Sequence, residues 1–333
     1  ADPTNLIQIA KECANFKNYE LMLEIGDRCQ KCIAKLSKER EERAPTRLKY
    51  EKLRDEKKEA VEQKKVLKPD QLQQLAAWEI EQELNKRILP KYAKKTLDQY
   101  DNDQLTILKT MLVSILNYKS ELSSNLKYII QNEFANLSTE SNKMTDEDQV
   151  DPKIEIKANI EKCNKNINSI VDQSLGFIEN PNHLYTLATT LNEYNEYDIA
   201  LTIGKVIQTK IPAIIKEKKE RDSIRNELEE LLDEERDIQE ARKQVKNRRK
   251  KLDVDKAQKL EELQLKVNMF KMTPNYKDSS PEQLDQLNLN NSILLIQAML
   301  KAKAADEAEM ELDSTISEQD KQDKNAKHDI KIN

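Results

Sequence analysis

The two stretches that decide the fold are LIQIAKECANFKNYELMLEIGDRCQKCIAKL, residues 6–36, and LYTLATTLNEYNEYDIALTIGKVIQTKIPAI, residues 184–214. They align without a gap, and the alignment pairs two of the three glycines of the protein. The matched pairs are Leu6 with Leu184, Ala10 with Ala188, Phe16 with Tyr194, Tyr19 with Tyr197, Glu20 with Asp198, Gly26 with Gly204 and Ile33 with Ile211. Self-similarity of this kind indicates an internal duplication.

Both stretches have the periodicity of a helical hairpin. In the second, apolar residues recur at i, i+3, i+4 and i+7, once before the polar turn 194–196 and once after it. These positions are Leu184, Leu187, Ala188 and Leu191, and then Ala200, Ile203, Gly204 and Ile207. We expect Gly26 and Gly204 to let two helices approach closely, because a glycine costs about 1 kcal/mol of helix propensity against Ala and tight packing offsets that cost.

The hairpin pattern resembles the tetratricopeptide repeat. The residues that carry the resemblance are Leu187-Ala188, Leu191, Tyr197-Asp198, Ala200 and Ile207, with Ile9-Ala10, Cys13, Tyr19-Glu20, Met22 and Cys29 in the first stretch. Tetratricopeptide repeats recur about every 34 residues, so a regular superhelix with a standard peptide groove does not follow from two distant hairpins. The resemblance implies a helical scaffold that binds proteins, with Tyr19, Gly26, Tyr197 and Gly204 as candidate packing or binding positions.

The similarity continues beyond the hairpins. Three further matches are Pro90-Lys91-Tyr92 with Pro274-Asn275-Tyr276, Asp103-Gln104-Leu105 with Asp285-Gln286-Leu287, and Met111-Leu112 with Met299-Leu300. A long charged segment follows each hairpin, at about 35–65 and 216–251, and its thin apolar stripe is typical of a helical arm. We predict that each arm pairs with a returning antiparallel helix, at 70–89 and 255–270, and that the prolines at 90 and 274 end those helices.

Composition supports an all-α fold. Only 3 of 333 residues are Gly, while 35% are charged, so few tight strand turns are available and long one-sided helices are favoured. We therefore predict two diverged copies of a hairpin-plus-arm unit, with an antiparallel, coiled-coil-like arm. The predicted segments are repeat unit 1 at 6–137, a polar linker at 138–152, a connecting helix at 153–183, repeat unit 2 at 184–312 and a disordered polar tail at 313–333.

The cysteines and histidines offer little catalytic or metal-binding material. Cys29-x-x-Cys32 has the spacing of a zinc or redox motif, but Cys13 and Cys29 align with the apolar Leu191 and Ile207. Structural free thiols are therefore the main interpretation of the four cysteines, Cys163 included, with one or two disulfides as the alternative. The histidines, His183 and His328, lie in a turn and in the tail, and no glycine-rich phosphate loop is present. We expect no cofactor, no metal and no enzyme activity.

One basic patch follows an acidic run in the second arm. Its members are Arg242, Lys243, Lys246, Arg248, Arg249, Lys250 and Lys251. Such a patch is typical of nuclear import or of binding to nucleic acid or an acidic protein. The simpler interpretation, a charge-polarised helix that pairs with a complementary helix, is favoured, since 56 basic residues face 61 acidic ones in the whole chain.

Two functions are compatible with these features. The first is a non-catalytic interaction scaffold or a structural component of a larger cytoskeletal or ciliary assembly, intracellular, whose partners are proteins with helical or acidic surfaces. The second is a secreted or surface-anchored helical antigen or adhesin of a protist parasite, compatible with the missing initiator Met and with the sequons at Asn136 and Asn290. Nucleic acid is an unlikely partner, and no run of 18 apolar residues predicts a transmembrane segment.

Overall fold

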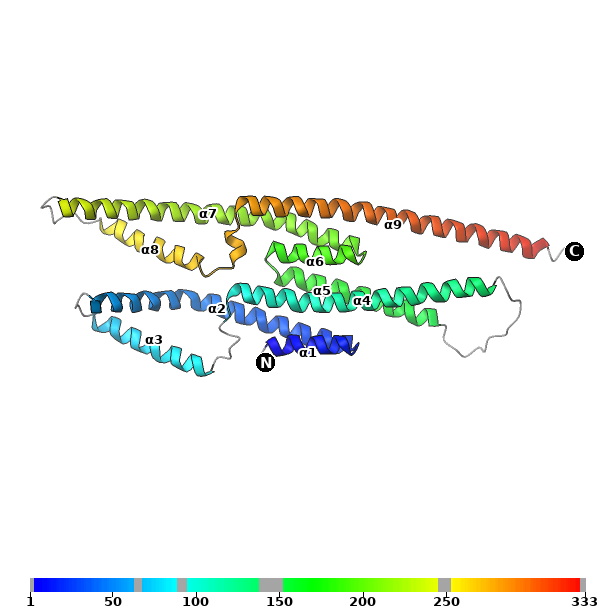
Figure 1. The fold of residues 1–333 in the computed structure, drawn as a ribbon, viewed down its shortest axis with the longest axis horizontal. Helices are drawn as coiled ribbons and strands as arrows, with labels where there is room; N and C mark the ends of the chain where they lie inside the picture. Colours follow the sequence, from blue (N-terminus) through cyan, green and yellow to red (C-terminus); the bar gives the residue numbers. More distant parts are fainter. Residues whose placement is uncertain (1–2, 63–67, 89–94, 138–151, 245–252, 330–333) are drawn as a thin grey trace. The chain divides into compact units, whose positions relative to one another are not determined.

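The computed structural model describes residues 3–62, 68–88, 95–137, 152–244 and 253–329, and every element within these ranges is helical (Figure 1). The α-helices are α1 (Pro3–Asn15), α2 (Tyr19–Glu62), α3 (Pro69–Ile88), α4 (Leu97–Leu137), α5 (Pro152–Phe177), α6 (Pro181–Glu193), α7 (Tyr197–Gln244), α8 (Val254–Phe270) and α9 (Pro281–Asp329), and η2 (Asn275–Asp278) is a single 3₁₀ turn. The predicted all-α class is confirmed.

The turns that join α1 to α2 and α6 to α7 have the same backbone geometry. In the first, Lys17 has a positive φ of 56°, and the N–H of Asn18 donates to the carbonyl oxygen of Cys13 over 2.9 Å. The second turn has Asn195 at φ 66° and the same bond between the residues 178 positions later, from 196 to 191. A left-handed residue with this bond ends a helix, because it satisfies carbonyl groups left open in the last helical turn.

Helices α4 and α9 begin with the same capping arrangement. The N–H of Thr96 donates to Gln99 Oε1 over 2.9 Å, and the N–H of Gln99 donates back to Thr96 Oγ1 over 3.3 Å. Ser280 and Gln283 form the equivalent pair over 2.8 and 3.3 Å. Each pair is a capping box, in which side chains satisfy N–H groups that the first helical turn leaves open.

Both hairpin glycines lie in close helix–helix contacts. A Cβ added to Gly26 of α2 would lie 2.0 Å from Sδ of Met111 in α4, and one added to Gly204 of α7 would lie 2.5 Å from Cδ2 of Leu295 in α9. The side chain that contacts Gly204 as Met111 contacts Gly26 is therefore Leu295 and not Met299. The sequence match to Met299 was misleading because packing at the glycine, and not residue identity, sets the helix register.

The charged arms are continuous with the hairpins. Helices α2 and α7 contain 44 and 48 residues, so the second helix of each hairpin continues as the arm without a break. In the first arm, the rings of Tyr50 and Trp78 stack with centroids 5.1 Å apart, joining α2 to the returning α3. In the second, Lys256 of α8 pairs with Glu234 of α7 over 2.7 Å.

The residues group into two compact units, 1–114 with 212–284 (unit 1) and 115–211 with 285–333 (unit 2). Helices α4, α7 and α9 each contribute residues to both units. The connecting segment 153–183 contains a helix break, because Asn180 caps α6 and Pro181 opens it. Helix α9 continues to Asp329 and so includes residues 313–329 of the predicted tail.

None of the helices in the described part of the chain has an apolar stretch long enough to cross a bilayer.

Replacing either hairpin glycine by alanine is expected to lower the free energy of unfolding by about 1–3 kcal/mol, because the added Cβ overpacks a filled contact. Gly176→Ala is the matched control, since this glycine lies in α5 with no atom within 4 Å of an added Cβ. That control is expected to raise the free energy by about 0.5–1 kcal/mol through helix propensity. Urea denaturation followed by circular dichroism measures all three variants, and a gain in stability from Gly26→Ala or Gly204→Ala would contradict the packing argument.

Candidate functional site

The candidate positions at the hairpins lie in two kinds of surroundings. Gly26 and Gly204 are buried, each against a side chain of a facing helix. Tyr19 and Tyr197 are half-buried at the first residues of α2 and α7. The hydroxyl of Tyr197 donates to Asn195 Oδ1 over 2.6 Å, and the ammonium group of Lys301 lies 5.8 Å from the centre of its ring. Tyr197 therefore braces the turn as well as contacting α9.

The predicted basic patch cannot be placed in the structure. Lys246, Arg248, Arg249, Lys250 and Lys251 lie outside the described residues. The side chains of Arg242 and Lys243, in the last turn of α7, also lie outside the described part.

None of the four cysteines, all of which lie in the described ranges, forms a disulfide. Cys13, Cys29 and Cys163 are buried and Cys32 is half-buried. Burial raises the pKa of the Cys163 thiol, although the nearby Lys119 partly lowers it. No group of three or more His, Cys, Asp or Glu side chains within the described ranges has the geometry to hold a metal ion.

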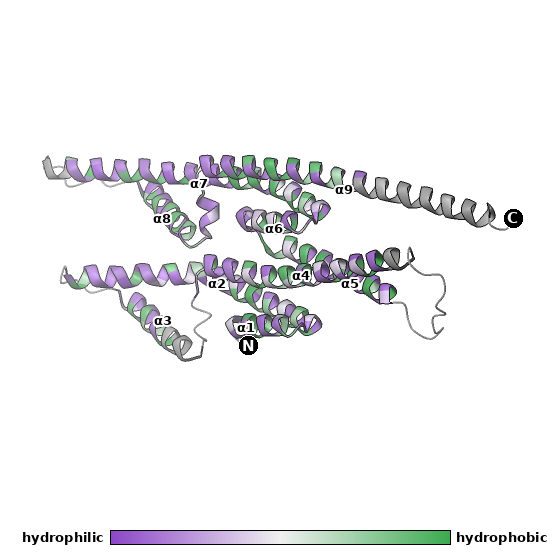
Figure 2. Cartoon of the chain, turned by 45° about the vertical axis from the view of Figure 1, so that its right-hand side comes forward, coloured by the Kyte–Doolittle hydropathy of each residue, from purple (hydrophilic) through white to green (hydrophobic). Residues whose placement is uncertain are grey.

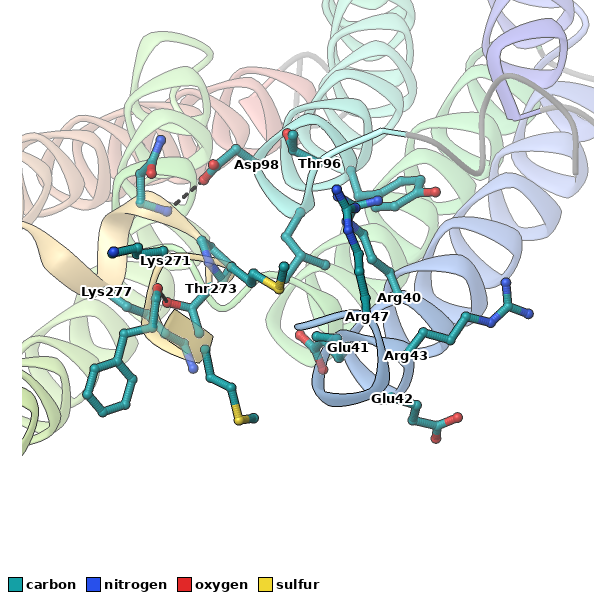
Figure 3. Close-up of a pocket in the computed structure, with 18 of the residues that line it drawn as sticks. Arg40, Glu41, Glu42, Arg43, Arg47, Thr96, Asp98, Lys271, Thr273 and Lys277 are labelled. Atoms are coloured by element: carbon teal, nitrogen blue, oxygen red, sulfur yellow. Dashed lines mark hydrogen bonds between the residues drawn. The ribbon is translucent and has the colours of Figure 1, made fainter. Parts of the chain in front are cut away.

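Unit 1 contains an open cavity of ≈1420 Å³ with a mixed polar and apolar lining (Figure 3). The polar residues that line it carry both signs of charge; they include Arg40, Arg43 and Arg47 with Glu39, Glu41 and Glu42 of α2, Asp98 at the start of α4, and Lys271, Thr273 and Lys277 around η2. Trp78, Tyr100 and Phe270 supply aromatic surface. Cationic groups above aromatic and methionine side chains suit a ligand that carries both an acidic group and apolar surface.

Arg40 is one of the cations that line this cavity. It is half-buried, and no carboxylate of the described residues pairs with it. Burial, followed by repulsion from Arg47, lowers the pKa of its guanidinium. An arginine remains charged at neutral pH and acts as a hydrogen-bond donor and not as a base. The arginines of the cavity can donate hydrogen bonds to an acidic group, and they do not supply proton-transfer chemistry.

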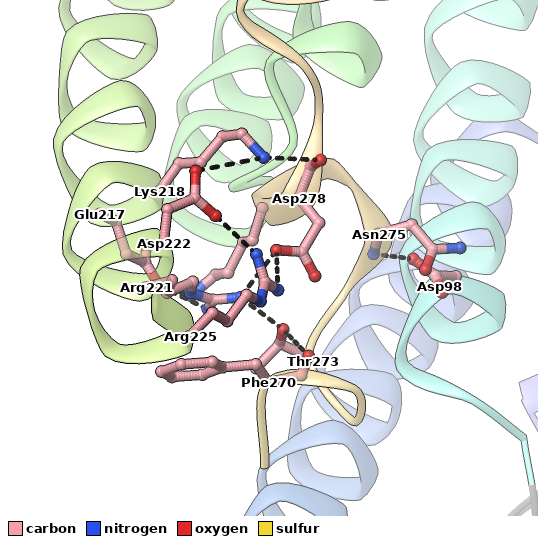
Figure 4. A network of polar contacts seen from close by, with 11 residues as sticks. Asp98, Glu217, Lys218, Arg221, Asp222, Arg225, Phe270, Thr273, Asn275 and Asp278 are labelled. Atoms are coloured by element: carbon pink, nitrogen blue, oxygen red, sulfur yellow. Dashed lines mark hydrogen bonds and ion pairs between the residues drawn. The ribbon is translucent and has the colours of Figure 1, made fainter. Parts of the chain in front are cut away.

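A network of two arginines, Arg221 and Arg225, with carboxylate partners holds η2 on α7 (Figure 4). Arg221 is only 4% exposed; it donates to Glu217 over 2.6 Å and to Thr273 over 2.9 Å, and its guanidinium lies 4.9 Å from the Phe270 ring centre. Arg225 donates to Asp278 over 2.8 Å, and this bond raises the pKa of its guanidinium. The network stabilises the chain reversal after α8.

The turn held by this network also contacts the start of α4. The N–H of Asn275 donates to Asp98 Oδ1 over 2.7 Å. Both residues line the cavity, so the arginine network positions one wall of it. The network is thus a structural support for the cavity and not itself an open binding site, because its guanidinium groups already have partners.

A second candidate site is the outer face of α9 in unit 2. Between residues 284 and 300 the helix is apolar on two opposite faces, and the first half of α9 is accordingly rich in hydrophobic colour (Figure 2). The inner face is buried and consists of Leu284, Leu287, Leu294, Leu295 and Ala298. The outer face is exposed and consists of Leu289, Ile293, Ile296, Met299 and Leu300. A helix that is apolar on both sides is normally buried on both sides, so an exposed second face indicates a docking surface.

Sequence reasoning did not identify this outer face. Its signal was nevertheless present, because residues 289, 293, 296 and 300 follow spacings of four, three and four, which place apolar side chains along one helical stripe. The inner stripe has similar spacing, so the sequence did not reveal which of the two faces is buried. The capping boxes at Thr96 and Ser280 were also readable, since each has the Ser/Thr-x-x-Gln pattern.

No protein-family model matches the chain, and no curated protein or solved structure is significantly similar to it. The functional argument therefore depends on the surfaces and contacts of this chain alone.

Arg221→Met is expected to lower the free energy of unfolding of unit 1 by about 1–3 kcal/mol, because it removes charge-assisted hydrogen bonds of a buried guanidinium while keeping similar bulk. Arg28→Met is the matched control. Arg28 also pairs with a glutamate over 2.6 Å, but its side chain is 70% exposed, so a change of less than about 0.5 kcal/mol is expected. Chemical denaturation of both variants tests the difference, and equal losses would mean that burial of Arg221 adds nothing.

Tyr100 predicts a pH dependence of stability. Burial raises the pKa of its phenol above the ordinary value of 10.0, and Arg40 offsets part of this rise. Between the ordinary and the raised pKa, the folded chain keeps a proton that the unfolded chain releases, so stability is fully present below pH 10 and declines above it.

Tyr100→Phe is therefore expected to reduce the loss of stability between about pH 9 and 11, measured as the shift of the urea midpoint across this range. Tyr128→Phe, at an exposed position, is the control and should leave the slope unchanged. An identical slope in the Tyr100 variant and the parent protein would exclude a contribution from this phenol.

Proposed function

We propose that the chain is a non-catalytic scaffold that binds other proteins, and that the exposed apolar face of α9 is a principal docking surface. The observation that carries this proposal is the contrast between the two faces of α9, one buried and one open, over the same residues 284–300. Leu, Ile and Met side chains of this size are stabilised by removal from water, and a contiguous exposed set of them is typical of an interaction site.

The proposed architecture is a duplicated hairpin-plus-arm unit. Three local similarities support it: the matching hairpin turns, the matching glycine contacts and the matching capping boxes. Tetratricopeptide-like hairpins would belong to this unit, and their role would be to present binding surfaces. A repeat buries one face against its neighbour, so the outermost helix of such an array has a face available to a partner.

The arms suit a role as spacers within a larger assembly. The arm portions of α2 and α7 are strongly hydrophilic (Figure 2) and carry ion pairs between residues four apart, such as Lys38 with Glu42 and Arg47 with Glu51. Such pairs support long helices in water and contribute little stability each. A cytoskeletal or ciliary assembly, with intracellular location, remains our proposed setting.

The free thiols favour the intracellular proposal over the secreted antigen or adhesin. Cys13, Cys29 and Cys163 are buried and form no disulfide, a state typical of proteins kept in a reducing compartment. The sequon at Asn290, which is compatible with secretion, lies within the helix α9. There the side chain of Asn290 accepts a hydrogen bond from Gln286 over 2.9 Å, so the side-chain amide that would carry a glycan already has a partner.

Site-specific photo-crosslinking tests the proposed function. A photoreactive amino acid at Ile296, on the outer face of α9, is expected to give protein adducts in the cells that express the chain. The same probe at Ile80 of α3 is the control, because Ile80 is also an exposed isoleucine, at 64% against 54%. Adducts at Ile296 that are absent at Ile80 support the docking surface, whereas the same pattern at both sites would remove its support.

A further inference from the structure

Unit 2 contains a direct contact between the tip of one hairpin and a neighbouring helix. The hydroxyl of Tyr194, in the α6–α7 turn, donates to Asn117 Oδ1 of α4 over 2.7 Å. Glu196 of the same turn pairs with Lys119 of α4, and both side chains are largely buried. A hairpin tip of this chain therefore packs on the surface of a helix of the α4 type.

The corresponding tip of the first hairpin is open. Phe16 occupies the position equivalent to Tyr194, and it is 82% exposed. On the preceding helix, Ile9 is 47% exposed, whereas its counterpart Leu187 in α6 is 1% exposed. The α1–α2 hairpin thus exposes apolar side chains at two positions whose counterparts in the α6–α7 hairpin are buried (Leu187) or half-buried (Tyr194).

The surface of α9 that corresponds to α4 is also open. Counting from the capping boxes, Met299 and Leu300 of α9 occupy the positions of Ile115 and Leu116 of α4. Ile115 and Leu116 are 1% and 2% exposed, but Met299 and Leu300 are 52% and 65% exposed. Each chain therefore has two exposed apolar surfaces, one on the α1–α2 hairpin and one on α9. Both correspond to surfaces that are more deeply buried in unit 2.

We propose that the outer face of α9 binds the α1–α2 hairpin of a second copy of this chain, in a head-to-tail arrangement. The proposal rests on the proposed docking function of α9 and names its partner. The interface is heterologous, since two different surfaces meet, so association continues beyond a dimer unless the rotation closes a ring.

The contact is expected to be mainly apolar. The ion pair between Lys119 and Glu196 would have no equivalent at this interface. The position of Lys119 is taken by Lys303 in α9, and the position of Glu196 is taken by the uncharged Asn18 in the α1–α2 turn. Since no ion pair is conserved between these positions, self-association should depend weakly on salt. The patch is small beside a standard interface, which buries about 800 Å² on each partner, so a reversible association of modest affinity follows.

Sedimentation velocity of the whole chain from about 1 to 500 µM, a range suited to weak interfaces, tests the proposal. The parent protein is expected to show concentration-dependent species larger than the 38.8 kDa monomer. Phe16→Glu and Leu300→Glu should each abolish these species. Ile80→Glu, at an exposed isoleucine of α3, should retain them. All three positions are exposed, and unchanged helicity by circular dichroism verifies folding.

Mixing the two deficient variants gives the decisive measurement. In a head-to-tail interface, Phe16→Glu still offers α9 and Leu300→Glu still offers the hairpin, so the mixture is expected to form a one-to-one dimer and nothing larger. Monomeric parent protein throughout the range would overturn the proposal.

Two further outcomes would exclude head-to-tail self-association, and each would indicate a different partner for α9. Self-association that survives Phe16→Glu and is lost in Leu300→Glu would mean that α9 pairs with α9 of the second copy. Adducts at Ile296 with a different protein, together with a monomeric parent chain, would leave the docking function standing and reject self-association.

Discussion

The close approach of helices at Gly26 and Gly204 is the constraint on which the other features depend. The absence of a Cβ lets Met111 and Leu295 fill the space beside the glycine backbone, which fixes the rotation of α4 and α9 about their axes. Once Leu295 faces inward, residues 293, 296 and 300 face outward, because helix geometry places them on the opposite side. The exposed face of α9 is therefore a consequence of the glycine contact as much as of its own sequence.

The arms depend on a different kind of contact. Their charged side chains form many exposed ion pairs, which contribute little to stability because water and salt screen them. Few apolar contacts join each arm to its returning helix, with Tyr50 on Trp78 as the clearest example. The second arm instead begins with a buried arginine, Arg221, whose hydrogen bonds and aromatic contact hold the turn η2. The first arm is thus joined to its returning helix by an aromatic contact, whereas the second arm is held at its base by the hydrogen bonds of a buried arginine.

The all-α class could be predicted from the sequence because glycine is scarce and apolar residues recur with the spacing of a helix. These two properties leave few alternatives to long helices. Both hairpins could also be located, since Lys17 and Asn195 lie in the polar turns that separate the apolar runs. The predictions from sequence were wrong at some helix ends and in the pairing of residues of α4 with residues of α9. The pairing of Met111 with Met299 followed residue identity, whereas the contact geometry selects Leu295. The candidate site was missed for a related reason, because two apolar stripes on one helix look alike in sequence.

The sequence by itself determined that the chain is helical, that its hairpins are alike and that its arms are highly charged, because these properties depend on local propensity and on spacing along one helix. Only the tertiary structure decided which face of α9 is buried, which arginine is enclosed and which residues line the cavity of unit 1. Those outcomes depend on which helices meet and at what rotation. Contacts such as that between Gly204 and Leu295 join residues far apart in the chain, so no local pattern specifies them.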